Sequence, residues 1–469
     1  VAAPTDYLVW YMARFLPDAP SKKPSGEALS KSSWCLFCSL VSWFGAFSMV
    51  RTFANSQETL LVALSMALVG PEFIGGRTER LQTQSYHARA SLAFFLGGLA
   101  ASIRFTALAA YLPIGILLAL QKERFASKIM YLLNPCAIFG ILGIFGAMGV
   151  DRFFFGFWTI PFLGNFHFNV VLDYADLYGS HPWYWNFTAA MPVVTGLLLP
   201  FGIFDIKRTV QNGQEGMRNL WIVVFCYLGI MSFNGHKEFR YVLPILPVFC
   251  LLAGQRLGIF ASSVGGGRRL FLMGLFVLAN LIALTYLGLF HQSGAISVNQ
   301  WIISDAFGHS ARQDFSIHYL TGACHSTPLH SHLHAPPLKF TTFTLDCSPL
   351  CRADPNLTCE TDQFRIDPVK FLTESVNGQC SAKDETCASS TSDIDLDYVV
   401  TMSPYVDLIQ PLLLEMGLRE VKYFPHSING AMVGGVVVGD EFKSGSFRHF
   451  KLLHGVEISL EEMVVFALT

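Results

Sequence analysis

Long apolar runs recur through most of the chain, and they limit what it can fold into. A run of about 20 apolar residues is typical of a helix that crosses a membrane. Composition agrees, because 52% of the 469 residues are hydrophobic and only 14% are charged, whereas soluble domains carry about 25% charged residues. We therefore predict an α-helical polytopic membrane protein with about nine spans. The predicted spans are residues 34–50, 58–74, 88–103, 106–121, 129–149, 189–205, 219–235, 240–257 and 269–291.

The connections between these runs differ in charge. Every second connection is rich in Lys and Arg, as between Lys122 and Lys128, and the positive-inside rule assigns such loops to the cytosol. The other connections then face the opposite side, which we expect to be the lumen of the endoplasmic reticulum. This predicted luminal set comprises residues 55–59, the turn at Arg104, residues 151–188, residues 236–240 and everything after His291.

The chain changes character after the last run, and we predict a domain boundary there. Residues 1–291 would form the transmembrane domain, and residues 292–469 a small luminal α/β domain. Six cysteines lie close together in this tail, which favours disulfides and an oxidising compartment. Asn356 begins the sequon Asn-Leu-Thr, so we predict that it is glycosylated. The six cysteines are Cys324, Cys347, Cys351, Cys359, Cys380 and Cys387.

The tail gives weaker signals of secondary structure. Residues 310–393 are rich in Ser, Thr, Pro, His and Cys, and we interpret them as loops held by disulfides. Residues 395–401 resemble a strand, and residues 405–417 resemble a helix that Pro411 would kink or split. Further strands are expected at residues 421–424 and 432–438.

A histidine cluster in the tail raises the question of a metal site. His330, His332 and His334 follow Cys324-His325, a spacing that resembles zinc ligands. The prolines among them and the expected oxidation of Cys324 favour a structural loop instead, so we predict no bound metal. The net charge of −2 argues against a nucleic-acid partner, which would require a basic face.

Four ionisable side chains within five residues stand between two apolar runs. They belong to the sequence His236-Lys-Glu-Phe-Arg240, hereafter the HKEFR motif. Such a density of charge suits a membrane surface, where water and a charged ligand can reach it. A short polar hairpin whose Lys and Arg extend toward lipid head groups is the simpler alternative.

Residues 151–188 form the longest luminal connection that we predict between spans, and they are rich in aromatic side chains. Trp and Tyr mix with Gly, Asn and His, as in Tyr178-Gly-Ser-His-Pro-Trp183. This composition suits an interfacial re-entrant element or a plain aromatic belt. It also suits sugar binding, in which aromatic rings stack on the ligand. On the last interpretation His181 and Trp183 are candidate binding residues.

Together these motifs resemble the dolichyl-phosphate-mannose-dependent mannosyltransferases of the C-type glycosyltransferase superfamily, and most of all the members that act in GPI-anchor biosynthesis. The HKEFR motif with Tyr241 matches the family pattern HKE-x-R-[FY]. Phe105 is a departure, because the family usually has Pro after the preceding Arg. The other matching stretches are Asn55-Ser-Gln-Glu-Thr59, Ile103-Arg-Phe-Thr-Ala107, Asp151-Arg-Phe-Phe-Phe-Gly156, Tyr178-Gly-Ser-His-Pro-Trp183 and Cys324-His-Ser-Thr-Pro-Leu-His-Ser-His332.

The resemblance implies a mannose transfer from dolichyl-phosphate-mannose to a GPI glycolipid precursor on the luminal face. It implies addition of the third mannose, in α-1,2 linkage, with inversion and without a cofactor. The leaving lipid phosphate needs cations to stabilise its charge. The candidate cations are Arg104, His236, Lys237 and Arg240.

Acidic residues near these cations have other expected roles. We expect Glu238 to orient its basic neighbours rather than to act as the base. Glu58 and Asp151 are candidates for supporting contacts or for binding the acceptor. In the superfamily the catalytic acid lies in the first luminal loop, near the N-terminus. No such His-Pro-Asp-Glu-like segment occurs here, so the catalytic residue is unknown.

The start of the chain bears on this absence. There is no initiator Met, and residues 7–16 resemble the tail of a longer apolar helix. We therefore expect a fragment that lacks an N-terminal part and is inactive by itself. Three alternatives stay open: an N-glycan mannosyltransferase of the same family, a polytopic lipid transporter, and a non-catalytic subunit of an enzyme. Its possible partner subunits are unknown.

Overall fold

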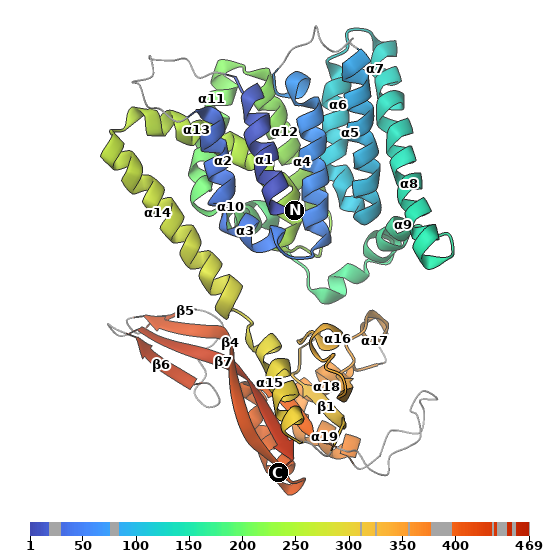
Figure 1. Ribbon diagram of the computed structural model, residues 1–469, viewed down its shortest axis with the longest axis vertical. Helices are drawn as coiled ribbons and strands as arrows, with labels where there is room; N and C mark the ends of the chain where they lie inside the picture. The colour runs from blue at the N-terminus through green and yellow to red at the C-terminus, as the bar shows by residue number, and fades with distance from the viewer. Residues whose placement is uncertain are drawn as a thin grey trace. The chain divides into compact units, whose positions relative to one another are not determined.

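The structure, a computed structural model, comprises two compact units, Val1–Leu284 and Thr285–Thr469. They divide a few residues before the predicted domain boundary at 291. The first unit is helical, and the second combines strands with helices (Figure 1). The structure describes residues 1–17, 30–75, 84–309, 312–323, 326–354, 357–376, 396–433, 436–438, 448–452 and 456–468.

The first unit is helical because a chain that crosses hydrocarbon must satisfy its own backbone hydrogen bonds. Short 3₁₀ and π segments join or interrupt the helices, notably at Phe105–Ala107, Leu132–Ala137 and Phe239–Ile245. The helices are α1 (Ala2–Met12), α2 (Lys31–Leu40), α3 (Trp43–Met49), α4 (Ala54–Phe73), α5 (Gln84–Ile103), α6 (Leu108–Leu120), α7 (Phe125–Tyr131), α8 (Ile138–Phe155), α9 (Pro161–Phe166), α10 (Met191–Thr195), α11 (Leu199–Asn212), α12 (Glu215–Ser232), α13 (Leu246–Ser263) and α14 (Gly266–Thr285).

Each of the nine predicted runs falls on helical structure. Within the described residues, four helical segments are long and apolar enough to cross a membrane, and α2 with α3 would make a fifth as one span bent by 62°. The prediction of a helical, multi-pass protein is confirmed. By this criterion the described residues hold fewer than nine spans, because α6 is only 13 residues long and α4, although 20 residues long, is not apolar enough. The four segments are Phe125–Phe155, Asn186–Gln211, Phe239–Ser263 and Gly266–Gly308.

Helix α4 packs against α5, and α8 packs along α5 (Figure 1). The approach of α5 to α8 requires glycine at two positions. A Cβ at Gly98 would overlap the carbonyl oxygen of Gly140, and a Cβ at Gly143 would overlap the carbonyl oxygen of Phe95. This close packing fixes the end of α5, where Arg104 begins the turn into α6.

The second unit is a sheet with helices on both faces. Its strand order is β2-β1-β3-β7-β4-β5, and β6 pairs with β7. β1, β2 and β3 are parallel, whereas β7 pairs antiparallel with its neighbours. One face packs on α15, and the other packs on α18, α19 and α20. The elements are α15 (Gly294–Gly308), β1 (Asp314–Leu320), α16 (Leu329–His332), β2 (Lys339–Thr344), α17 (Pro349–Ala353), α18 (Glu360–Ile366), α19 (Pro368–Val376), β3 (Tyr398–Met402), α20 (Ser403–Glu415), β4 (Leu418–Val433), β5 (Val436–Val438), β6 (Arg448–Leu452) and β7 (Val456–Leu468).

The prediction of loops at residues 310–393 was wrong, because that stretch contains β1, β2 and α16 to α19. In β1 the buried residues Phe315, Ile317 and Tyr319 alternate with more exposed ones, which is a strand pattern that the polar composition concealed. The helix expected at residues 405–417 is α20 (Ser403–Glu415), and it is not split at Pro411. α20 continues through this proline, which lies exposed, so that solvent can satisfy the carbonyl that loses its partner.

The other tail predictions fare better. β3 occupies the strand expected at 395–401, and one long strand, β4, includes the strand expected at 421–424. Cys351 and Cys359 form a disulfide, as the cysteine count indicated. Cys347 is disulfide-bonded as well. Asn356, Cys324, Cys380 and Cys387 lie outside the described residues.

Candidate functional site

The HKEFR motif begins in the break after α12, and its last two residues, Phe239 and Arg240, start the 3₁₀ segment Phe239–Ile245. Its backbone is extended at Glu238, with φ −135° and ψ 152°. Pro244 and Pro247 follow within the next turns and suit the start of a helix, because proline lacks the amide hydrogen that a helix interior needs. Only residues 236–238 of the motif are therefore non-helical.

Glu238 is the centre of the motif. Its Oε1 accepts a hydrogen bond from Nη2 of Arg240 at 2.7 Å, and its Oε2 lies 2.6 Å from Nε of the same guanidinium. Oε1 also lies 3.1 Å from Nε2 of His236 and accepts from the Tyr241 hydroxyl at 3.3 Å. One carboxylate thus fixes two basic side chains and a phenol.

These contacts decide the charge of the motif. Burial by itself would raise the pKa of the Glu238 carboxyl, but the hydrogen bonds and charges of His236 and Arg240 outweigh it and lower the pKa to about 2. The hydrogen bond to Glu238 raises the pKa of His236 above its usual value, against the effect of burial. A carboxylate of such low basicity is a poor proton acceptor, which agrees with the orienting role expected for Glu238.

Lys237 forms no ion pair with Glu238 among the described residues and is almost fully buried, with 3% of its surface exposed. Its Nζ donates to three carbonyl oxygens, those of His181, Asn234 and Gly235. An ammonium group has three donors, so this contact set uses all of them. Lys237 therefore ties the motif to residues 178–182, and two further bonds support it, from His181 N–H to the Gly235 carbonyl and between His236 Nδ1 and the Gly179 carbonyl.

A second carboxylate–arginine pair lies beside the motif. Glu58, on the first turns of α4, has no exposed side-chain surface, and its Oε2 lies 3.3 Å from Nε of Arg104. Thr106 donates to Oε1 of Glu58 at 3.2 Å. Both partners come from the turn between α5 and α6, which forms although Phe105 replaces the proline of the family pattern.

Tyr241 joins the two pairs. The guanidinium carbon of Arg104 lies 5.1 Å from the centre of the Tyr241 ring, while the hydroxyl of that ring donates to Glu238. The guanidinium carbon of Arg240 lies 5.6 Å from the ring centre of Phe53, just before α4. Three segments that are distant in sequence thus build one cluster, hereafter the arginine cluster, with two arginines held by two carboxylates.

The remaining predicted site residues, His181, Trp183 and Asp151, differ in how they connect to this cluster. The ring of His181 stacks on Trp185 with centroids 4.6 Å apart, and Trp185 packs against Phe239 of the motif. Trp183 is 69% exposed. Asp151, on α8, has no hydrogen bond or ion pair to the arginine cluster among the described residues.

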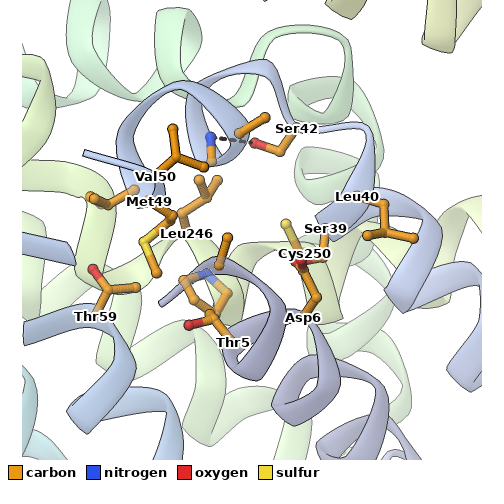
Figure 2. Close-up of a pocket in the computed structure, with 15 residues that line it drawn as sticks. Thr5, Asp6, Ser39, Leu40, Ser42, Met49, Val50, Thr59, Leu246 and Cys250 are labelled. Carbon is orange, nitrogen blue, oxygen red and sulfur yellow. Dashed lines mark hydrogen bonds between the residues drawn. The ribbon is translucent and has the colours of Figure 1, made fainter. Parts of the chain in front are cut away.

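A pocket of about 240 Å³ opens between α1, α3, α4 and the start of α13 (Figure 2). Its wall is largely apolar, but Asp6 of α1 lines it and accepts a hydrogen bond from Ser39. Thr59, next to Glu58 on α4, lines it too. We did not single out Asp6 from the sequence. An acidic residue inside an apolar helix is the signal that could have found it.

Metal ligands are not assembled in the part of the chain that the structure describes, where no group of three His, Cys, Asp or Glu side chains is placed to hold an ion. Cys324 and His325 of the candidate zinc cluster lie outside that part.

Residues 21–334, more than half of the chain, match the Alg9-like mannosyltransferase family. The chain belongs to this family. Similar proteins include GPI alpha-1,2-mannosyltransferase 3 of Homo sapiens, 30% identical over 72% of this chain and 56% of that protein. Mannosyltransferase APTG1 of Arabidopsis thaliana is 30% identical over 73% of this chain and 62% of that protein. GPI mannosyltransferase 3 of Schizosaccharomyces pombe is 29% identical over 73% and 66%.

This member of the Alg9-like family spans little more than half the length of the human protein that it matches. No solved structure matches it. The region shared with the family contains both carboxylate–arginine pairs and the whole HKEFR motif.

Proposed function

We propose that this chain is the part of a mannosyltransferase that binds the lipid donor. The proposed reaction moves mannose from dolichyl-phosphate-mannose to a GPI glycolipid precursor, as its third mannose in α-1,2 linkage. We place the reaction on the luminal side of the endoplasmic reticulum membrane, with the second unit and a glycosylated Asn356 on that side. The names of the similar proteins support the GPI substrate.

The observation that carries the proposal is the pair of arginines in the arginine cluster. Arg104 and Arg240 are each held by a carboxylate, yet each keeps surface exposed, 22% and 40% of the side chain. An arginine fork matches the oxygens of a phosphate. Holding the fork in advance lowers the cost of ordering it when the ligand arrives.

The chemistry of the step explains why such cations are needed. An acceptor hydroxyl oxygen forms a bond to the anomeric carbon of mannose as the bond from that carbon to the phosphate oxygen breaks. The electron pair of the broken bond stays on dolichyl phosphate, so negative charge grows there. Arg104, Arg240 and protonated His236 lie on elements that can meet this charge. The hydroxyl proton goes to a base that we do not assign to any residue of this chain.

The other predicted residues take supporting places in this proposal. Glu58 and Glu238 orient the arginines. Lys237 holds the motif against residues 178–182 and does not contact phosphate, because its three donors serve backbone carbonyls. His181 and Trp183, on the aromatic connection, would bind sugar. Asp151 would contact the acceptor only if the acceptor extends to α8.

The alternatives are an N-glycan mannosyltransferase of the same family and a lipid transporter or non-catalytic subunit. A transporter would use charges near the middle of the bilayer. The arginine cluster instead gathers at the N-terminal end of α4 and at helix breaks. The similar proteins with GPI in their names favour GPI over N-glycan substrates.

Mannose transfer in microsomes tests the proposal. Membranes from cells that lack their own GPI α-1,2-mannosyltransferase 3, and that express this chain within a full-length enzyme, receive dolichyl-phosphate-mannose and a GPI precursor with two mannoses. We expect one added mannose, and Arg240→Gln should lower the rate about 100-fold or more at equal protein level. Transfer to an N-glycan precursor instead, or full activity of Arg240→Gln, would contradict the proposal.

A further inference from the structure

Strand β2 lies at one edge of the sheet in the second unit, and among the described strands it pairs with β1 alone. The N–H of Lys339 donates to the Gln313 carbonyl next to β1, so the backbone groups of Lys339 face β1. Successive residues of a strand direct these groups to opposite sides, so Phe340, Thr342 and Thr344 direct theirs away from β1. The edge therefore offers a row of donors and acceptors to a further strand.

The apolar core on the α15 side of the sheet is open at this edge. A groove of about 510 Å³ lies there, lined by Leu329 and Leu333 and by Phe340 and Thr342 of β2. The ring of Phe340 stacks on Phe315 of that core, with centroids 6.1 Å apart. Because side chains alternate along a strand, the residues with outward backbone groups all turn their side chains to the groove side. A strand added to β2 would therefore also cover the groove.

The sequence of β2 suits pairing with itself. It reads Lys-Phe-Thr-Thr-Phe-Thr, and in an antiparallel pair centred on Thr342 each Phe340 lies opposite Thr344 of a second copy. Aromatic and β-branched residues form favourable cross-strand pairs. This register also gives a partner to every outward backbone group of β2, because Thr342 faces Thr342 and Phe340 faces Thr344 on both sides of the centre.

Charge favours the same arrangement. Lys339 is the one charged residue of β2, and the antiparallel pair sets the two lysines about 20 Å apart at 3.3 Å per residue. Lys339 and His334 line the groove, and Asp346, two residues after β2, is exposed. Because Thr344 of one copy lies opposite Phe340 of the other, Asp346 of one copy comes toward Lys339 of the other. Opposite charges therefore approach at each end of the contact.

From these observations we infer that the β2 edge is a contact between two copies of the chain, joined by a two-fold axis at Thr342 into one continuous sheet. A two-fold contact pairs both edges at once and leaves neither free. A strand from another protein is the competing occupant, and it would leave its own second edge unpaired. The inference goes beyond the proposed function and does not depend on it.

Position 342 provides variants that act on this contact. Thr342→Pro removes an outward N–H and keeps the bonds to β1. Thr342→Glu and Thr342→Lys each set two like charges opposite one another across the axis, which is unfavourable, whereas one Glu copy and one Lys copy would attract. Thr373→Glu is a matched control, because Thr373 is exposed on α19, which packs on the other face of the sheet.

The test is the mass of the purified chain in detergent, measured by light scattering over a range of concentrations. We expect a dimer for the unmodified chain and for Thr373→Glu. Each variant at Thr342 should weaken self-association about tenfold or more, without a change in thermal unfolding for the two charged variants. When Thr342→Glu and Thr342→Lys are co-expressed with different affinity tags, each should co-purify the other.

The outcomes are distinct. A dimer that survives all three variants would place the contact elsewhere and overturn the inference. A monomer at every concentration would also overturn it, and would leave the edge to a strand from another protein. Recovery of association by the Glu and Lys copies together is a result that a general loss of stability could not produce. If those two copies do not associate, Thr342 does not lie on the axis and the contact is wrong.

Discussion

Helix α4 carries a buried carboxylate near each end, and each carboxylate pairs with an arginine that follows it in sequence. Near the N-terminal end Glu58 meets Arg104 at 3.3 Å, and near the C-terminal end Glu72 meets Arg89 at 2.6 Å. Neither glutamate has exposed side-chain surface. The two pairs are alike in residue type and in the burial of the glutamate, although the Glu72–Arg89 contact is the shorter.

Their surroundings differ. Arg89 also donates to the Leu68 carbonyl of α4, so it is bound entirely to the helix that supplies its carboxylate. Arg104 lies over Tyr241, which leads to Glu238 and Arg240. The comparison teaches that a buried ion pair is not in itself a candidate site. The second arginine beside it makes the difference.

The largest effect should come from neutralising the Glu58–Arg104 pair, and the Glu72–Arg89 pair is the control. Glu58→Gln with Arg104→Gln, and Glu72→Gln with Arg89→Gln, remove both charges of a pair while keeping hydrogen-bonding groups. The first double variant should lose mannose transfer about 100- to 1,000-fold, because it removes a stabiliser of the leaving phosphate. The second should keep its activity per folded molecule, measured in microsomes at matched protein level. Equal losses in both would erase the distinction between the two ends.

A single substitution at either glutamate sharpens the same comparison through stability. Glu58→Ala and Glu72→Ala each leave a half-buried arginine without its carboxylate, so we expect losses of about 1–3 kcal/mol in unfolding free energy. Thermal unfolding in detergent is the measurement. A loss at Glu72 alone would mean that the Glu58 pair is not a structural contact at all.

Lys237 provides the next contrast, because it is a cation inside the motif that we assign to structure. Lys237→Met should leave three carbonyl oxygens without their donor and cost about 2–4 kcal/mol. The local consequence is faster amide hydrogen exchange at His181, whose N–H bonds to the Gly235 carbonyl. The affinity for dolichyl phosphate should change much less than in Arg240→Gln. A loss of affinity as large as in Arg240→Gln, with unchanged exchange at His181, would place Lys237 on the phosphate.

The smallest effect should be the pH dependence of donor binding. His236 has a raised pKa, so its positive charge is present at low pH and is lost as the pH rises through that value. Glu238, with a pKa of about 2, stays ionised throughout. We therefore expect the KM for dolichyl-phosphate-mannose to rise a few-fold between about pH 6 and pH 8.5. His236→Gln should flatten this rise, and an unchanged profile in that variant would remove His236 from the charge balance.

The same pair contributes to stability in opposite pH windows. The stabilisation from His236 is complete below its unfolded pKa, about 6.5, and is lost as the pH rises through its higher folded value. The stabilisation from Glu238 is present above its unfolded pKa and is lost only as the pH falls toward about 2.

Sequence alone could predict the helical, multi-pass architecture, because a helix that crosses a bilayer needs a long apolar run. Such a run can be recognised by its length, without a periodic pattern of apolar residues. It could also single out the HKEFR motif as a candidate site, since charge between apolar runs is rare enough to stand out. It could not separate Lys237 from Arg240, because the difference lies in which carbonyls reach Nζ. That contact set joins residues more than fifty positions apart, such as His181 and Lys237.

The two glutamates of α4 illustrate the same limit. Glu58 was a candidate through family resemblance, whereas Glu72 has the same residue type and the same burial and drew no attention. Only the fold shows that the Glu58–Arg104 pair lies beside Tyr241, and through it beside Glu238 and Arg240. In the second unit, β1 and β2 were missed because Ser, Thr and His conceal a period-two burial pattern that parallel pairing makes clear.

The most direct measurement of the central claim is equilibrium binding of dolichyl phosphate to the purified protein in nanodiscs. It needs no catalytic base and so addresses the arginine cluster by itself. The account predicts that Arg104→Gln with Arg240→Gln abolishes detectable binding, while Glu72→Gln with Arg89→Gln binds like the unmodified protein. Equal binding by all three proteins would contradict it.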